Sequence, residues 1–354
     1  MRLALDAGLE SRGSTASNPW VGCVLVRDGA VIATGRTQLP GAAHAEAHAL
    51  AQIDARGADA YVTLEPCTPF PGKRTPPCAQ ALIDAGLKRV VVALEDPDPA
   101  VSGRGIAMLR AAGLEVETGD GREEAIASLR PYLKQRKTGL PHVIAKFAVS
   151  ADGKLGAPAF GLRQITGEAA RERVHADRAW VDAILVGIQT VLDDDPSLTA
   201  RPGGQYAMRQ PARIVLVSHG RFPETARMLG EPGATVIACS PDAPAAWRER
   251  MRSAGAQVLE LEPGLNLDQL LAVLGRRGML SILVEGGGRV LGSFFDGGLV
   301  DEVHAYIAPL VIGPSGIPAI NGDTSFPMEP LRLLDSRFEA LPPDVLLRGF
   351  TREL

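Results

Sequence analysis

One histidine, one glutamate and two cysteines constrain the fold of this chain more than any other feature of its sequence. His44-Ala45-Glu46 opens an alanine-rich stretch, Pro66-Cys67 follows an apolar segment, and Cys78 comes after ten further residues. One imidazole and two thiolates suit tetrahedral Zn²⁺, and three protein ligands leave a fourth position for water, as in catalytic sites. We therefore expect His44, Cys67 and Cys78 to bind one Zn²⁺ per chain, which lowers the pKa of a bound water to about 7.

Helix geometry gives Glu46 a different role from His44. Two residues along a helix correspond to a rotation of about 200°, so the two side chains converge only beyond the helix N-terminus. Cys78 follows Pro76-Pro77, which favours a helix start, and two helix N-termini directed at the metal would stabilise a thiolate and a hydroxide. We predict that Glu46 is the catalytic proton shuttle. The alternative is a structural zinc site with His48, on the same helix face as His44, as the fourth ligand.

Composition narrows the classes of function. The 354 residues suggest about two domains. A formal net charge of −4 and an aromatic content of 5% are unfavourable for binding nucleic acid. No apolar run approaches the roughly 18 residues of a membrane span, and Asp6 and Glu10 interrupt the apolar start, so we expect a cytoplasmic protein with no membrane partner. Cys23 and Cys239 lie in apolar runs and are expected in the core.

Both halves alternate strand-like and helix-like segments, which is typical of α/β layers. The polar segment Lys134–Pro141 separates an expected first domain of residues 1–138 from a second of residues 139–354. In the first half we expect strands at Val21–Val26, Ala30–Thr34, Ala60–Leu64, Arg89–Leu94 and Leu114–Thr118, and helices at His44–Ala55, Ala79–Ala85, Gly105–Ala112 and Arg122–Gln135. In the second half we expect strands at Val143–Val149, Ala183–Val186, Arg213–Val217, Thr235–Ala238, Ser281–Val284 and Glu302–Ala308, helices at Gly167–Arg178, Leu267–Leu274 and Val290–Phe295, and a hairpin or edge strand at Ala340–Phe350.

A glycine run marks the second half. Val284-Glu285-Gly286-Gly287-Gly288 lies between an expected strand and an expected helix, where backbone N–H groups can bind a phosphate. It is not a Rossmann fingerprint, because Leu291 stands at the third glycine position, and a tight strand–helix turn is the alternative. The acidic run Asp193-Asp194-Asp195 by itself indicates only a surface loop.

The motifs of the first half resemble those of a known family. His-Ala-Glu with Pro-Cys and a second cysteine is similar to the signature of the zinc-dependent cytidine-deaminase-like fold. Asn18-Pro19-Trp20-Val21-Gly22, HAEAHAL, YVTLEPC, RTPPC and DPDPAVSGRGIAMLRAAGLEV resemble the bifunctional riboflavin-biosynthesis deaminase/reductase family. The resemblance implies contacts of the deaminase substrate with Asn18 and Lys73.

AKFAVSADGK, DRAWVDAILVG, TVLDDDPSLTAR, RIVLVS and ILVEGGG resemble the reductase domain of the same family. The implied fold class is α/β, with an N-terminal cytidine-deaminase-like α/β/α domain and a C-terminal dihydrofolate-reductase-like α/β domain. One stretch departs from the family pattern Ser-x-Trp-Ile-Thr and reads Leu162-Arg163-Gln164-Ile165-Thr166. The resemblance implies NADPH contacts at Ala148, Thr190, Asp194, Ser218, Gly287, Gly288, Arg289, Val290, Leu291, Gly292 and Ser293. It implies contacts of the reductase substrate at Leu162, Arg178, Leu198, Arg201 and Glu285.

The resemblance implies two successive steps of riboflavin synthesis on a small pyrimidine ribose phosphate. The first is zinc-dependent hydrolytic deamination of 2,5-diamino-6-ribosylamino-4(3H)-pyrimidinone 5′-phosphate. The second is NADPH-dependent reduction of the ribosyl side chain, which gives 5-amino-6-ribitylaminouracil 5′-phosphate. The sequence itself offers Asp152, Asp194 and Glu285 as candidate proton donors for the reduction without choosing among them. The alternatives are a nucleic-acid base deaminase with an accessory nucleotide-binding domain and a non-catalytic regulator that binds zinc and nucleotide. The first would need a basic patch with aromatic residues, which the sequence lacks. We expect a homo-oligomer.

Overall fold

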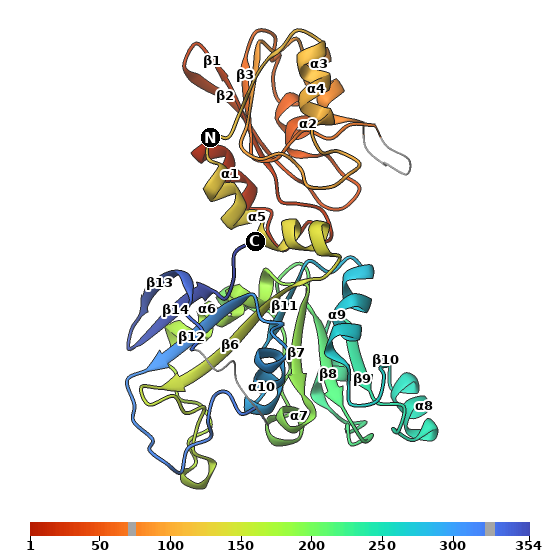
Figure 1. Ribbon diagram of the computed structural model, residues 1–354, viewed down its shortest axis with the longest axis vertical. Coiled ribbons are helices and arrows are strands. Elements are labelled where there is room, and N and C mark those ends of the chain that lie inside the picture. Colours follow the sequence, from red (N-terminus) through yellow and green to blue (C-terminus); the bar gives the residue numbers. More distant parts are fainter. Residues whose placement is uncertain (70–75, 323–329) are drawn as a thin grey trace. The chain divides into compact units, whose positions relative to one another are not determined.

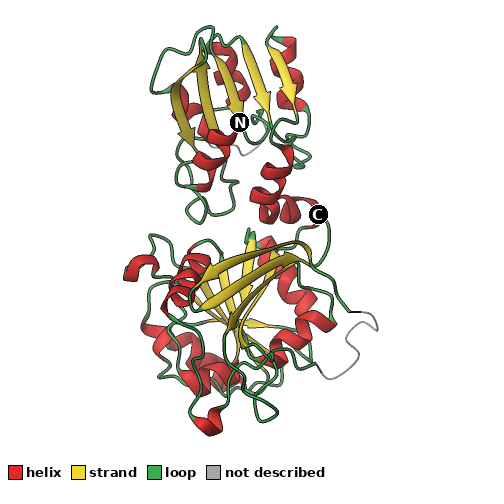
Figure 2. Cartoon of the chain, turned by 90° about the vertical axis from the view of Figure 1, so that its left-hand side faces the viewer, coloured by secondary structure: helices red, strands yellow, loops and turns green. Residues whose placement is uncertain are grey.

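The computed structural model describes residues 1–69, 76–322 and 330–354, which form two compact units (Figure 1). The first unit is Met1–Gly139 and the second is Leu140–Leu354. Each unit is a β-sheet accompanied by helices (Figure 2). In the described ranges, no helix combines the length and the apolar character that crossing a bilayer requires.

The first unit contains a five-stranded sheet in the order β2-β1-β3-β4-β5. β1 is antiparallel to β2 and β3, whereas β3, β4 and β5 are parallel. Asp28 and Gly29 have φ angles of 53° and 78°, as a tight hairpin between β1 and β2 requires. The strands are β1 (Gly22–Arg27), β2 (Ala30–Arg36), β3 (Asp59–Val62), β4 (Arg89–Val92) and β5 (Glu115–Thr118). The helices are α1 (Arg2–Leu9), α2 (Ala45–Leu50), α3 (Cys78–Asp84), α4 (Arg104–Ala111) and α5 (Arg122–Thr138).

Two glycines let helices pack closely on opposite faces of this sheet. Because Cys23 pairs with Gly35, Gly22 and Gly35 face opposite sides. A Cβ atom on Gly22 would lie 1.7 Å from the carbonyl oxygen of Ala4 in α1. A Cβ atom on Gly35 would lie 2.1 Å from the carbonyl oxygen of Ala45 in α2. Thus α1 covers one face and α2 the other, which is the expected α/β/α arrangement.

The second unit contains a nine-stranded sheet in the order β10-β9-β8-β7-β11-β6-β12-β14-β13. The strands from β10 to β12 are parallel, and β14 and β13 continue the sheet as an antiparallel hairpin. The strands are β6 (His142–Ser150), β7 (Ala183–Gly187), β8 (Ala212–Val217), β9 (Thr235–Cys239), β10 (Gln257–Glu260), β11 (Ser281–Val284), β12 (Glu302–Ala308), β13 (Leu334–Leu341) and β14 (Asp344–Phe350). The helices are α6 (Glu168–Ala179), α7 (Ile188–Asp194), α8 (Ala245–Ser253), α9 (Leu267–Arg276) and α10 (Gly288–Asp296).

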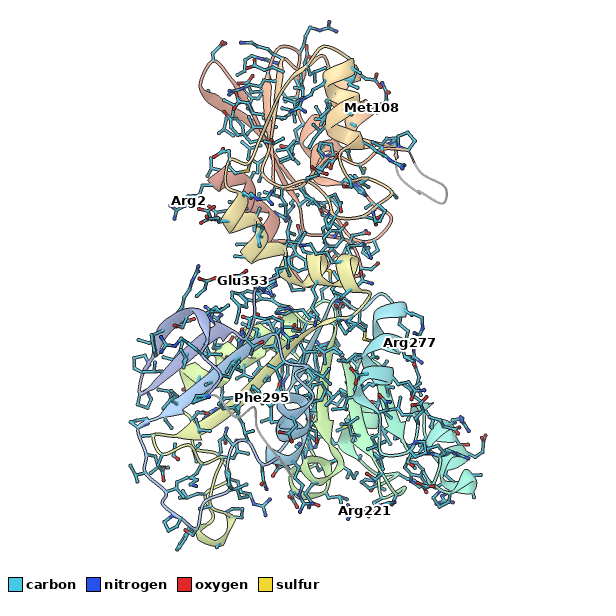
Figure 3. All side chains as sticks on the ribbon, viewed as in Figure 1. Arg2, Met108, Arg221, Arg277, Phe295 and Glu353 are labelled. Carbon is cyan, nitrogen blue, oxygen red and sulfur yellow. The ribbon has the colours of Figure 1, made fainter. Side chains whose placement is uncertain are left out.

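The central strands of this sheet are buried on both faces. Leu185 belongs to the hydrophobic core that includes Leu271 of α9 and Phe294 of α10. Its neighbour Ile184 belongs to the opposite core, which includes Trp247 of α8. This alternation explains why the strands read as unbroken apolar runs. Arg277, at the end of α9, is exposed outside these cores (Figure 3).

Some elements differ from the sequence expectation. The helix expected over His44–Ala55 covers only Ala45–Leu50, and at its end the Gln52 side chain, rather than a backbone N–H, donates a hydrogen bond to the carbonyl of His48. Helices α7 and α8 and strand β10 were not expected. In α8 only Trp247 and Met251 are buried, so the sequence shows almost no apolar periodicity there.

Candidate functional site

The structure brings together the three residues expected to bind a metal. His44 is the N-cap of α2, Cys67 lies in the loop after β3, and Cys78 is the first residue of α3. One ligand atom from each lies within 4.8 Å of the other two. The His44 Nδ1 atom is 3.5 Å from Cys67 Sγ and 3.4 Å from Cys78 Sγ. Tetrahedral zinc with ordinary Zn–N and Zn–S bonds would separate such atoms by about 3.5 Å. The donor set and its spacing therefore fit Zn²⁺.

The electrostatics around the two thiols favour a bound cation. The backbone N–H of Cys78, at the helix N-terminus, donates to Cys67 Sγ at 3.4 Å. The hydrogen bond with Cys67, burial and the charge of Glu46 raise the pKa of the Cys78 thiol well above its usual value. A metal ion is what would hold both sulfurs as thiolates in this enclosed position.

Glu46 lies in the first turn of α2, almost fully buried beside this cluster. Burial, followed by the charge of Cys67, raises the pKa of its carboxyl group to about 7. A group with a pKa near the working pH can both accept and release a proton, which is what a proton shuttle requires.

His48 does not join the metal cluster within the described part of the chain. Its Nδ1 atom lies 3.2 Å from the backbone nitrogen of Arg36 and 3.2 Å from the side-chain nitrogen of Gln38. The described ligand set is therefore His44, Cys67 and Cys78, and the structural-zinc alternative that used His48 finds no support here.

A cavity of about 130 Å³ opens beside the metal cluster. Asn18, His44, Glu46 and Cys67 are among its lining residues. Asn18, one of the two residues expected to contact the deaminase substrate, thus lines this cavity, whereas Lys73 lies outside the described residues.

The cavity is also lined by Asp96, Tyr132 and Arg136, which the sequence analysis did not predict as site residues. Asp96, from the loop after β4, is buried, and burial raises the pKa of its carboxyl group to about 6. Both of its carboxylate oxygens accept from the Tyr132 hydroxyl, at 3.1 and 3.0 Å. Arg136, one turn further along α5, also lines the cavity. The sequence signal for α5 was that of a connecting helix, and only its position in the fold reveals these residues.

In the second unit, the expected cofactor residues gather at the carboxyl ends of parallel strands. Ala148 lies near the end of β6, Thr190 and Asp194 lie in α7 after β7, and Ser218 directly follows β8. Gly287 is the N-cap of α10, and the stretch from Gly288 to Ser293 forms its first turns. Ligands of open α/β sheets commonly bind at this edge.

The run Gly286-Gly287-Gly288, which ends at the first residue of α10, has a different structural reason for each glycine. A Cβ atom on Gly286 would lie 2.7 Å from the Val290 side chain, and one on Gly288 would lie 2.7 Å from the Pro318 carbonyl oxygen. The nearest atom to a Cβ on Gly287 is the Thr190 hydroxyl oxygen, at 4.0 Å. Packing therefore explains the outer glycines, whereas Gly287 borders open space beside Thr190, where a ligand can approach the backbone.

Arg178 and Glu285, two of the expected substrate residues, form a buried ion pair. The guanidinium Nε donates to Oε1 at 2.6 Å and a terminal nitrogen donates to Oε2 at 2.9 Å. Lys146 Nζ is 3.6 Å from the same carboxylate. Although burial acts to raise it, the charges of Arg178 and Lys146 lower the pKa of Glu285 to about 2.

The other expected substrate residues lie in loops. The Leu198 side chain is buried in the core and its φ angle is 48°, so the side chain is not available to a ligand. Leu162 is partly exposed. Arg201 precedes a short 3₁₀ turn at Pro202–Gly204. Across the described ranges Arg201 forms no ion pair with the acidic run, since Asp194 pairs with Arg163 at 3.3 Å and Asp195 with Arg227 at 4.0 Å.

Two of the three candidate proton donors are held as carboxylates. Asp152 accepts hydrogen bonds from Ser150 and from the backbone N–H groups of Ile312 and Gly313, which lower the pKa of its carboxyl group to about 2. Glu285 is ionised by its two cations. Neither group carries a proton to donate near neutral pH.

A chain of buried charges lies between β12 and α6. The His304 ring is 3.0 Å from Asp177 Oδ2 and 2.8 Å from Glu302 Oε1. The Tyr306 hydroxyl donates to Asp177 at 2.7 Å, and the Tyr306 ring lies 5.6 Å from Lys146 Nζ. The chain therefore extends from Glu302 to the cation that contacts Glu285.

Known proteins match both units. The family described as RibD C-terminal domain matches residues 141–347, and the cytidine and deoxycytidylate deaminase zinc-binding region matches residues 1–94. The riboflavin biosynthesis protein RibD of Bacillus amyloliquefaciens is 38% identical over 359 residues, which cover 100% of this chain and 96% of that protein. RibD of Escherichia coli (strain K12) is 40% identical over 325 residues, with 88% of each chain covered.

Solved structures give the same result. Acinetobacter baumannii RibD, form 1, matches with a TM-score of 0.89 and 37% identity, covering 99% of this chain and 98% of its own. A Thermotoga maritima protein, described as a diaminohydroxyphosphoribosylaminopyrimidine deaminase/5-amino-6-(5-phosphoribosylamino)uracil reductase, matches with a TM-score of 0.84 and 30% identity over 99% of this chain and 97% of its own. The expected fold class, a cytidine-deaminase-like domain followed by a dihydrofolate-reductase-like domain, is confirmed.

Proposed function

Since the chain belongs to the RibD family of riboflavin biosynthesis proteins, we propose that its metal cluster and its glycine turn serve the two reactions of that family. The chain is a bifunctional enzyme with a zinc-binding deaminase domain and an NADPH-dependent reductase domain. We assign deamination to residues 1–138 and reduction to residues 139–354. The observation that carries the first assignment is the meeting of His44, Cys67 and Cys78 beside the buried Glu46.

In the deaminase, the substrate is 2,5-diamino-6-ribosylamino-4(3H)-pyrimidinone 5′-phosphate. His44, Cys67 and Cys78 would hold Zn²⁺, which would supply a Lewis acid that makes water nucleophilic near neutral pH. The Glu46 carboxylate takes a proton from the attacking water and passes it to the ring. Glu46 then takes the remaining proton from the hydroxyl group added to the ring and delivers it to the amino group, so that ammonia leaves and a carbonyl replaces the amine. Asn18 lies in the cavity wall, where it can orient the pyrimidine.

In the reductase, bound NADPH would supply the hydride for reduction at C1′ of the ribosylamino group. The backbone N–H groups at the start of α10 are placed to bind a cofactor phosphate next to Thr190. Arg178, which Glu285 holds rigidly, contributes positive charge for an anionic substrate. Arg201, which has no ion-pair partner among the described residues, is a second cation for that substrate.

The remaining expectations concern partners and location. Small-molecule substrates are those of the family. A homo-oligomer, the absence of a nucleic-acid partner and a cytoplasmic location stay predictions. The nucleic-acid deaminase alternative is not favoured, because the relatives match over both units rather than over the deaminase part alone.

Mass analysis of one incubation tests both assignments. The purified chain is incubated with the pyrimidinone phosphate, with and without NADPH. We expect exchange of an amino group for oxygen in both reactions, and a gain of two hydrogens only with NADPH. Ammonia release from a tRNA anticodon stem but not from the pyrimidinone phosphate would contradict the proposal, as would an unchanged substrate.

A further inference from the structure

Among the described residues that line the deaminase cavity, acidic groups outnumber basic ones. Its described lining includes the carboxyl groups of Glu46, Glu65, Asp96 and Asp98. Arg136 is the one lysine or arginine among those lining residues. The proposed substrate adds a phosphate with close to two negative charges, and such a group binds best to guanidinium and backbone N–H donors. Among the described lining residues, Arg136 is therefore the candidate for a positive contact with that phosphate.

The N-terminus of α4, which borders the cavity, cannot provide this contact because Glu65 already occupies it. Glu65 Oε1 accepts from the backbone N–H groups of Gly105 at 2.7 Å and Ile106 at 3.2 Å. Oε2 accepts from those of Gly103 at 2.9 Å and Asp96 at 3.2 Å. A buried carboxylate thus takes the N–H groups that a phosphate would otherwise use.

Arg136, in contrast, is held in place by its neighbours and makes only a weak contact with a carboxylate. Its guanidinium lies 4.9 Å from the centre of the Tyr132 ring and donates to the Ser17 carbonyl at 3.2 Å and to the Gln135 side chain at 2.6 Å. Its Nε atom is 3.5 Å from Asp98 Oδ2, which is longer than a good charge-assisted hydrogen bond. Both partners of this ion pair are partly exposed, so the pairing is weak.

We propose that Arg136 binds the 5′-phosphate of the deaminase substrate, exchanging its long contact with Asp98 for phosphate oxygens. This inference rests on the deaminase substrate proposed above. The contact with the Tyr132 ring and the hydrogen bonds to Ser17 and Gln135 restrain the guanidinium, and a restrained fork binds a phosphate with little loss of side-chain freedom. Arg136 is thus a specificity-determining residue for the phosphorylated substrate, and Glu46 and the metal act on the ring.

The test compares two substrates, the pyrimidinone ribose phosphate and the same compound without phosphate, by ammonia release. Arg136→Met keeps the side-chain length and removes the charge. We expect KM for the phosphorylated substrate to rise at least about tenfold with kcat nearly unchanged, and KM for the dephosphorylated compound to stay the same. Lys137→Met, which removes the same charge at the exposed neighbouring position of α5, should change neither KM.

Ribose 5-phosphate provides an independent readout as a competitive inhibitor of deamination. Its inhibition constant should rise about tenfold in Arg136→Met, and zinc content should stay at the wild-type level. Arg136→Lys, which keeps the charge and the fold but loses the planar fork, should give a smaller rise in both constants.

Equal losses on both substrates, or no change on either, would overturn the proposal and leave Arg136 as a structural residue. If the wild-type chain released no ammonia from either compound, the deaminase assignment itself would be wrong. In that case calorimetric titration of ribose 5-phosphate into the wild type and Arg136→Met still decides whether Arg136 binds a phosphate.

Discussion

The two sites of this chain are built in different ways. In the first unit, three side chains of characteristic chemistry bring their ligand atoms within 4.8 Å of one another, next to one buried carboxyl group. In the second unit, the expected site is spread over strand ends, a glycine turn and an ion pair between α6 and the end of β11. A site made of side-chain chemistry depends on residue identity, whereas a site made of backbone and preformed charge pairs depends on packing. Substitutions should therefore act locally in the first unit and through the fold in the second.

The largest effect is expected for Cys67→Ala. Loss of a thiolate ligand should remove most of the zinc and abolish deamination, while the reductase, assayed with already deaminated substrate, stays active. Metal analysis and the two activity assays measure this. Cys239→Ala is the matched control, because Cys239 is a buried thiol of β9 with no metal ligand nearby in the described structure. Full zinc occupancy in Cys67→Ala would show that Cys67 is not a ligand, and that the first site does not depend on the identity of this side chain.

Glu46→Gln separates the chemistry of the first site from its structure. The amide keeps the size of the side chain and cannot shuttle a proton, so deamination should fall by about 10²–10⁴-fold. Zinc content and reductase activity should remain at wild-type levels. If zinc is lost instead, Glu46 is a ligand, and the division of roles at the first site is wrong.

Arg178→Met tests whether the second site depends on its preformed ion pair. The change leaves the buried Glu285 carboxylate with only Lys146, at 3.6 Å. Breaking one side of such a pair should lower the free energy of unfolding of the second unit by about 3–5 kcal/mol. The double variant Arg178→Met/Glu285→Gln should regain much of that stability without regaining reductase activity. Calorimetric melting measures the stability of each variant, and the reductase assay measures its activity. Equal stability of the single and double variants would argue against an energetic coupling between Arg178 and Glu285.

The buried charges behind this ion pair give the smallest and most gradual effect, a pH dependence of stability. Burial acts to lower the pKa of His304, but hydrogen bonds with Asp177 and Glu302 raise it to about 9. The folded pKa exceeds the unfolded value of about 6.5, so this stabilisation is fully present below pH 6.5 and is lost as pH rises through about 9. It amounts to something on the order of 3 kcal/mol.

The melting temperature of the second unit should therefore fall more steeply between pH 6 and pH 9.5 in the wild type than in His304→Gln, whose side chain does not titrate. At acid pH the sign reverses, because the pKa values of Asp177 and Glu302 are lowered in the folded chain, and their stabilisation is lost as they become protonated. Parallel profiles for the two proteins would mean that His304 is not charged.

The sequence predicted the metal cluster because ligand chemistry depends on residue type, and the helix starts at His44 and Cys78 followed from local rules. It did not predict Tyr132 and Arg136, because nothing local in α5 shows which of its sides faces a cavity. The charges on β12 were equally hidden: Glu302 and His304 are polar residues within a strand, and only the packing of α6 places Asp177 against them. Local sequence rules predict helices and strands, whereas contacts between residues distant in the sequence can be identified only once the fold is known.

The position of α5 in the chain has a consequence for synthesis on the ribosome. All three metal ligands and Glu46 are translated well before Tyr132 and Arg136, which complete the cavity wall. Because N-terminal domains generally fold first during translation, the metal cluster can assemble while the cavity is still open on one side. A fragment that stops short of α5 would retain the metal ligands but lack the wall that holds Asp96.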